Sequence, residues 1–303
     1  MSYLLIGNIS ALICEDCIEP LANARIRVYL PDTSPQAATR KTTKVTPDHM
    51  RPLFAQEVLM KAERLLVEGK LDDKGNFSLV WENNNTDTAA LELDLCLDEM
   101  PGKNGNIQSR NYHLSLLQPH WKNNGNGYVG AYAYLIPADV WRKICGNAGA
   151  WVITGTVRHS LKPGGQSHLK VEAYNAISGK LIGQTITNES GKYTLHFSRR
   201  DLYKGTLEPM RPGKMNRGPD VYFKVYRNEQ LLWSETEHDA AVPERQDLPP
   251  CSCLNIKYKS SVVKRANLWL NDMITLRGIR KKHRDQYRFG YNARLIVKDF
   301  PFV

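Results

Sequence analysis

Alternating apolar and polar positions organise the first part of the chain. Between residues 3 and 13, Leu5, Gly7, Ile9 and Ala11 fall at every second position. A period of two places these residues on one face of a strand, so the pattern predicts a strand with that face in a core. The same alternation predicts further strands at residues 24–30, 77–81, 91–97 and 112–117. Together they predict a first β-sandwich over residues 1–120.

The period changes after the first two strands. Thr46 is a residue type that caps helices, and Pro47 suits a first helical position. Apolar residues then recur every three or four positions from Leu53 to Leu66. This pattern predicts an amphipathic helix over about residues 47–68, inserted in the first sandwich.

The strand plan returns later in the chain. Residues 121–150 are rich in glycine, asparagine and aromatic side chains, and we interpret them as a linker with a short helix at 137–143. Alternation resumes at Trp151, which predicts a second β-sandwich over residues 151–258 without an inserted helix. Its strands are expected at residues 151–157, 169–173, 193–197, 221–225 and 253–258.

Two turns of the same design mark the repeat. The turns Asp72-Asp-Lys-Gly75 and Asn188-Glu-Ser-Gly191 each begin with a side chain that bonds nearby backbone N–H groups and end with glycine. We interpret both as hairpin turns. Gly155 follows Gly7 by 148 residues, whereas Gly191 follows Gly75 by 116. The difference of 32 residues matches the loop and helix inserted in the first copy.

The residues of both copies resemble one superfamily. Gly7-x-Ile9, then Ala24-x-Ile26-x-Val28, then Asp72-x-x-Gly75-x-Phe77 is similar to the transthyretin-like, or carboxypeptidase regulatory-like, β-sandwiches. The second copy resembles them with Asn188 in place of the aspartate. The resemblance implies a mainly β fold with two transthyretin-like (Ig-like) sandwiches in tandem, one helical insertion and a C-terminal extension. The family it points to is functionally broad and mostly non-catalytic.

Enzymes related to this superfamily have motifs that the chain lacks. The intradiol dioxygenases use a His-x-His pair, and all eight histidines here are isolated; the hydroxyisourate hydrolases end in Tyr-Arg-Gly-Ser, whereas this sequence ends in Lys298-Asp-Phe-Pro-Phe-Val303. The acids Asp94, Asp98 and Glu99 follow a leucine alternation typical of a solvated strand face. We therefore predict no enzyme, no catalytic residue and no cofactor. The alternative is a metal-dependent or hydrolytic enzyme with a rearranged site.

Two cysteine pairs have a spacing that metal sites use. Cys14-x-x-Cys17 is one, and Cys251-x-Cys253 could supply two further ligands. Because the two pairs belong to different predicted sandwiches, we expect no metal site. No apolar run approaches the ~20 residues that span a bilayer, and no basic leader precedes the apolar start. The expected location is therefore the cytoplasm with reduced thiols, or an exported assembly that carries the protein outward.

The basic charge of the chain is concentrated near its C-terminus. The whole chain carries a formal charge of +10, and residues 261–303 hold ten Lys and Arg against three Asp, a net of +7. We predict that this extension, at residues 259–303, docks on another protein subunit or on a second copy. The candidate partner-binding residues combine basic and aromatic side chains: Trp269, Arg277, Arg280, Lys281, Lys282, Arg284, Tyr287, Arg288, Phe300 and Phe302.

Two other interpretations of the extension stay open. It could pack against its own sandwich, or its basic and aromatic residues could bind nucleic acid, which we consider the weaker fit. The apolar ends at residues 295–297 and 300–303 favour docking, because such segments add to the edge of another sheet. A two-module protein with an extended arm would suit a large bacterial assembly, such as a contractile injection or type VI-like secretion apparatus.

Overall fold

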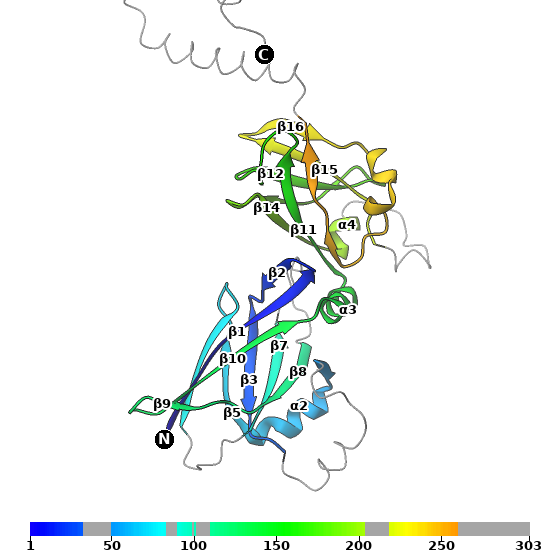
Figure 1. Ribbon diagram of the computed structural model, residues 1–303. Helices are drawn as coiled ribbons and strands as arrows, with labels where there is room; N and C mark the ends of the chain where they lie inside the picture. The colour runs from blue at the N-terminus through cyan, green and yellow to red at the C-terminus, as the bar shows by residue number, and fades with distance from the viewer. Residues whose placement is uncertain (33–49, 83–89, 99, 101–109, 204–217, 260–303) are drawn as a thin grey trace, which may run out of the picture. The chain divides into compact units, whose positions relative to one another are not determined.

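The computed structural model describes residues 1–32, 50–82, 90–98, 100, 110–203 and 218–259. The chain divides into two compact units, Met1–Tyr258 and Lys259–Val303. Only Lys259 of the second unit is described, so the following concerns the first unit (Figure 1).

The first β-sandwich has two layers. One sheet has β1 at its centre, with β10 and then β9 on one side and β2 and β6 on the other, and the second sheet has the order β4-β8-β7-β3-β5. Its strands are β1 (Ser2–Cys14), β2 (Cys17–Pro20), β3 (Ala24–Tyr29), β4 (Arg51–Leu53), β5 (Leu65–Lys70), β6 (Asn76–Glu82), β7 (Leu91–Leu97), β8 (Arg110–Leu117), β9 (Lys122–Asn123) and β10 (Tyr128–Ile136).

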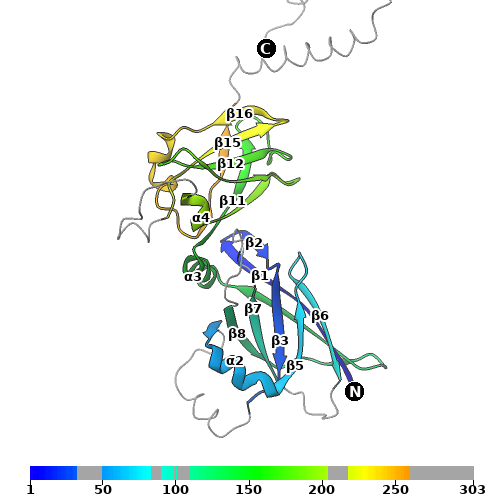
Figure 2. The same cartoon turned by 180° about the vertical axis from the view of Figure 1, so that it is seen from behind.

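The second sandwich repeats this topology. One sheet places β11 between β14 and the pair β17 and β18, and the other has the order β13-β12-β15-β16 (Figure 2). Its strands are β11 (Ala150–His159), β12 (Lys170–Asn175), β13 (Leu181–Ile186), β14 (Lys192–Ser198), β15 (Val221–Arg227), β16 (Gln230–Ser234), β17 (Cys251–Cys253) and β18 (Ile256–Tyr258). The order β13-β12-β15-β16 matches the order β5-β3-β7-β8 in the first sandwich. The mainly β fold with tandem sandwiches is therefore confirmed. The transthyretin-like identity stays a prediction.

Each sandwich encloses its own apolar core. In the first, the leucines of β7 point inward and are fully or almost fully buried, together with Phe77, Leu79 and Trp81 of β6. In the second, Tyr193 and Phe223 lie among the buried aliphatic residues. Short helices lie outside these sheets: α2 (Ala55–Lys61), η1 (Ala62–Arg64), α3 (Ala138–Ala148), α4 (Arg199–Tyr203), η2 (Asp239–Ala241) and η3 (Pro243–Arg245).

The inserted helix is shorter than predicted. It begins at Ala55, after the short strand β4, and its α-helical part ends at Lys61. Residues 65–68, predicted to be helical, belong to β5, which pairs with β3. Pairing across the sheet therefore overrides the helical spacing of Leu65 and Leu66. The predicted cap at Thr46 and Pro47 lies outside the described residues.

The segment predicted to be a linker is part of the first sandwich. β10 runs parallel to β1 from Tyr3 opposite Tyr128 to Ala11 opposite Ile136. It is the counterpart of β17 and β18, which run parallel to β11. α3 follows β10 directly, and its buried Trp141 and Ile144 join the same core. The first sandwich therefore extends beyond residue 120.

Matched glycines allow these parallel strands to approach. A Cβ added at Gly7 would overlap the carbonyl oxygen of Tyr132 and the ring of Phe77. A Cβ added at Gly155 would overlap the carbonyl oxygen of Leu254, with the Tyr193 ring beside it. In both copies, therefore, a glycine of the first strand lies against the parallel last strand and against an aromatic ring.

The repeated turns are corners between sheets and are not hairpins. The first joins β5 of one sheet to β6 of the other, and the second joins β13 to β14 in the same way. Asp72 Oδ1 accepts hydrogen bonds from the backbone N–H groups of Lys74 (2.8 Å) and Asn76 (2.7 Å). Asn188 Oδ1 accepts the equivalent bonds at 3.0 Å and 2.9 Å. Gly75 and Gly191 have φ of 74° and 75°, which glycine adopts without strain.

Candidate functional sites

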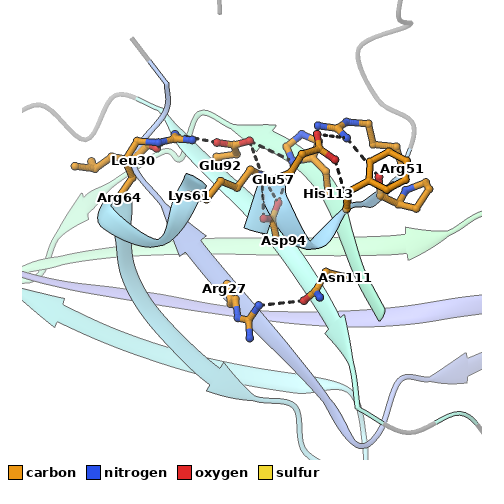
Figure 3. A network of polar contacts seen from close by, with 12 residues as sticks. Arg27, Leu30, Arg51, Glu57, Lys61, Arg64, Glu92, Asp94, Asn111 and His113 are labelled. Carbon is orange, nitrogen blue, oxygen red and sulfur yellow. Dashed lines mark hydrogen bonds and ion pairs between the residues drawn. The ribbon is translucent and has the colours of Figure 1, made fainter. Parts of the chain in front are cut away.

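A layer of charged side chains covers the outer face of the sheet that contains β7. Because side chains alternate along a strand, Glu92 and Asp94 point away from the leucine core. They point toward α2, which lies over this face (Figure 3). The prediction that Asp94 lies on a solvated strand face is wrong, because only 3% of this residue is exposed.

Lys61 at the end of α2 neutralises these acids. Its Nζ lies 2.9 Å from both carboxylate oxygens of Asp94 and 2.7 Å from Glu92 Oε1. A buried carboxylate is costly unless it is paired and hydrogen-bonded, so the inserted helix brings the cation that allows Asp94 to be covered. Lys61 also lies over the Tyr29 ring, 5.4 Å from its centroid. Burial, with a contribution from Asp94, raises the pKa of Tyr29 to about 12.

Further groups complete this network. His113 Nδ1 lies 3.0 Å from Asp94 Oδ1, and one Arg64 guanidinium nitrogen lies 3.1 Å from Glu92 Oε2. Single ligand atoms of Glu92, Asp94 and His113 lie within 4.8 Å of one another, an arrangement that metal ions use. Here the Lys61 ammonium already bonds two of the three. The cluster is therefore best described as an ion-pair network that fixes α2 to the sheet.

Arginines of β3 extend the charged layer along the sheet. Arg25 bonds both oxygens of Asp98 at 2.6 Å, and both Arg25 and Arg27 pair with Glu68. Burial alone would raise the pKa of Glu68, but the hydrogen bonds from the two arginines outweigh it and lower that pKa. Asp98 is thus half-exposed and ion-paired, and Glu99 lies outside the described residues.

The same helix exposes apolar side chains. Leu59 and Met60 are 73% and 68% exposed, and Phe54 at the N-cap is 76% exposed, whereas Lys61 is 6% exposed. A helix on the surface of a soluble domain ordinarily buries its apolar side and exposes its charges. α2 therefore reverses the predicted amphipathic arrangement, because Lys61 pairs with the sheet. We call Phe54, Leu59 and Met60 the α2 apolar surface.

Five of the six cysteines lie around β17. Sulfur atoms of Cys14, Cys17 and Cys253 lie within 4.8 Å of one another, and Cys145 of α3 is hydrogen-bonded to Cys251. All are free thiols. The sequence led us to expect that Cys14 and Cys17 lie apart from Cys251 and Cys253. This expectation is wrong for Cys253, because β17 contacts β1 in the folded chain. Cys145, which sequence reasoning did not single out, completes the group.

The thiols of this region are held in protonated or hydrogen-bonded states. Burial, followed by hydrogen bonds with Cys17 and Cys253, raises the pKa of the Cys14 thiol. The hydrogen bond between Cys145 and Cys251 raises the pKa of the first and lowers that of the second. Beside them, Glu19 of β2 pairs with His196 of β14. The contact between the two sandwiches therefore includes both thiols and an ion pair.

A partly open pocket of about 610 Å³ lies in the second sandwich, with Trp233, Val242 and Leu254 among its lining residues. Its ion pair is Glu235 and Arg245, 2.7 Å apart with each side chain 11% exposed, and the Arg245 guanidinium lies over the Phe223 ring. Burial raises the pKa of Glu235, although Arg245 opposes the shift. Because the carboxylate also accepts a backbone hydrogen bond from Phe223, the pair fixes the pocket wall.

The predicted partner-binding residues of the C-terminal extension, from Trp269 to Phe302, lie outside the described residues. Of the helices that are described, none is long and apolar enough to cross a membrane.

Comparison with known proteins adds little to this geometry. No family model matches the chain, and no curated protein matches its sequence. The shaft pilin SpaA from Lactobacillus rhamnosus GG is similar over 86% of this chain and 98% of the pilin, with 10% identity and a TM-score of 0.27. The minor pilin GBS52 from Streptococcus agalactiae is similar over 85% of this chain and 95% of the pilin, with 8% identity and a TM-score of 0.24. Scores this low establish no shared topology, so the function rests on the chain's own geometry.

Proposed function

We propose that this protein is a non-catalytic structural or interaction module of a larger protein assembly. The observation that carries the proposal is the α2 apolar surface, where Phe54, Leu59 and Met60 face outward while Lys61 is buried. Exposed apolar side chains gathered on one element mark interaction sites more often than isolated ones do. The partner is another protein subunit whose apolar surface covers these side chains.

The C-terminal extension supplies a second contact in this proposal. Residues 261–303 carry a net charge of +7 and end in the apolar segments 295–297 and 300–303, a composition that supports an extension that docks on another subunit. Its aromatic and apolar residues, including Trp269, Phe300 and Phe302, provide the area to be buried, and its arginines and lysines favour an acidic partner surface.

The charged clusters of the described body support a non-catalytic role. A general acid or base needs a proton-transfer group that can reach a substrate. Asp94 instead has both oxygens bonded to Lys61, and Glu235 is bonded to Arg245 and to the backbone. We further propose that both sandwiches are of the transthyretin-like kind, and that the assembly resembles a bacterial contractile injection or secretion apparatus.

Substitution on the α2 apolar surface tests the first contact. In the full chain, Leu59→Glu with Met60→Glu should leave folding intact, because both side chains are exposed, and should weaken association with the partner or with a second copy. Leu161→Glu with Ile177→Glu is the matched control, since these side chains are 72% and 79% exposed on the second sandwich. Equal association of both variants and the unchanged chain in sedimentation velocity would contradict the proposal.

Substitution in the extension tests the second contact. Replacing Arg280, Lys281, Lys282 and Arg284 by alanine should slow or weaken docking, whereas replacing four exposed lysines of the body should not: Lys122, Lys162, Lys192 and Lys257. Docking through apolar residues should persist in high salt. Binding of nucleic acid that falls steeply with salt would instead favour the nucleic-acid interpretation.

A further inference from the structure

The three-thiol group combines a local turn with a distant strand. Cys14 ends β1 and Cys17 begins β2, and the two residues are paired across the turn that Glu15 and Asp16 form. Cys253 ends β17, which is aligned in parallel with β11 of the second sandwich. The fold therefore places a third sulfur against a Cys-x-x-Cys turn that lies more than 200 residues earlier in the chain.

The geometry suits a thiophilic metal ion. Sulfur binds zinc at about 2.3 Å, so two thiolates in tetrahedral coordination lie about 3.8 Å apart. The sulfurs here lie within 4.8 Å of one another, so small side-chain rotations would bring them to coordination distance. Thiolates select zinc and monovalent copper over magnesium or calcium. Because Cys253 is exposed and Cys14 and Cys17 are half-buried, an ion can reach the site.

Water can supply the fourth ligand. Asp16 is exposed in the turn between Cys14 and Cys17, but its carboxylate does not belong to the group of ligand atoms that lie within 4.8 Å of one another. Three thiolates with one water satisfy the four-coordinate preference of zinc. The other candidate clusters lack this opening: Lys61 takes the place of a cation at Asp94, and the buried pair of Cys145 and Cys251 offers two sulfurs.

We propose that Cys14, Cys17 and Cys253 bind one zinc ion, with water in the fourth position. Binding releases the thiol protons to solvent and forms three Zn–S bonds. The ion would connect the β1–β2 turn of the first sandwich to the last strands of the second. It is thus a structural clasp, and it is independent of the docking surfaces proposed above.

Metal titration of the full chain tests this site. The protein is purified with reductant, stripped of metal and titrated with Zn²⁺, and with Co²⁺ as an optical probe of thiolate coordination. We expect one equivalent per chain, sulfur-to-cobalt charge-transfer absorption, and an unfolding temperature that zinc raises by several degrees. Cys253→Ser should lower the affinity at least about tenfold and abolish the thermal shift.

Two control variants separate this site from other thiols. Cys96→Ala removes a buried thiol next to Arg25 and Asp98, and Cys251→Ala removes the neighbouring thiol that pairs with Cys145. Both should retain one equivalent of metal. Three results would overturn the proposal: no stoichiometric binding, binding that survives Cys253→Ser, or a Cys14–Cys17 disulfide that persists in reductant and excludes the ion. Cys17→Ser provides a second test if Cys253→Ser fails to fold.

Discussion

The two sandwiches share their strand order but differ on the outer face of one sheet. In the first, α2 covers the outer face of β7, and Lys61 is buried against Asp94. In the second, a stacked pair of tyrosines, Tyr174 and Tyr222, lies on the corresponding face, with Lys224 4.4 Å from the Tyr174 ring centroid. Lys170 lies over the ring of Tyr226 on this face, and the Lys170 side chain is 26% exposed.

The difference shows that two features have separate causes. One is the strand arrangement that both sandwiches share, which we call the common frame. The other is the outer face of the first sandwich that α2 covers, which we call the special surface. The frame depends on close backbone contacts that both copies repeat, above all at Gly7 and Gly155. The special surface depends on the insertion between β3 and β5, because the equivalent connection from Asn175 to Leu181 is a short turn. An inserted helix that covers charged strand residues must bring compensating charge, and its own apolar side chains are then left outside.

The largest effect should come from breaking the shared frame. Gly7→Ala and Gly155→Ala should each cost more than about 4 kcal/mol or prevent folding, because the new Cβ would overlap a backbone carbonyl oxygen that cannot move away alone. Urea unfolding monitored by circular dichroism measures the loss. Gly183→Ala is a mild control, because it has no positive φ and a Cβ added there would lie 3.6 Å from its nearest neighbour, Leu195. If Gly7→Ala were tolerated, β10 would behave as a linker after all.

Breaking the special surface should have the next largest effect. Lys61→Met should destabilise the protein by about 3–5 kcal/mol, because it leaves Asp94 buried without its cation. Adding Asp94→Leu should recover most of the loss, since an apolar pair can replace a buried ion pair. Lys170→Met in the second sandwich should cost only a small fraction of this loss in the same unfolding experiment, because Lys170 is a partly exposed cation that pairs with Glu172 and Glu229. Equal effects of the two lysine variants would contradict the comparison.

The smallest effect should come from exchanging the two corner turns. Asp72→Asn and Asn188→Asp should be almost neutral at pH 7, because either side chain accepts the same two backbone hydrogen bonds. Bonds from Asn76 lower the pKa of Asp72. Its contribution is therefore present at neutral pH and is lost as the pH falls below about 4, through the folded-state pKa.

The pH dependence distinguishes these variants. Asp72→Asn should make unfolding less sensitive to acid, and Asn188→Asp should make it more sensitive. Thermal unfolding from pH 7 to pH 3 measures both. Identical acid sensitivity of the two variants would show that the turn carboxylates contribute no stability that acid removes, which would contradict this account.

Local patterns predicted the strands well, because alternation and turn residues are properties of neighbouring positions. They failed at residues 65–68, where helical spacing competed with a strand partner at Tyr29 and Val28, far away in sequence. They failed again at β10, whose glycine and aromatic residues resemble a linker until they are placed beside β1. Parallel pairing across more than 100 residues leaves no local signal.

The sites depended even more on tertiary structure. Asp94 alternates with leucines as a solvated acid would, and only the position of α2 shows that it is buried. Lys61 lies three positions after Val58, on the same side of the helix, which is the one local hint that a cation faces the sheet. The approach of Cys253 to Cys14 and Cys17 follows from the packing of β17 and could not be read from spacing.

Truncation after Tyr258 tests most directly the claim that this is an interaction module with a docking extension. Residues 1–258 form one compact unit, so the shortened protein should unfold at the same temperature as the full chain. In sedimentation velocity the full chain should self-associate or capture its partner subunit, and the shortened protein should not. An unfolded truncation product would show that the extension belongs to the core, and unchanged association would show that it does not dock; either result contradicts the account.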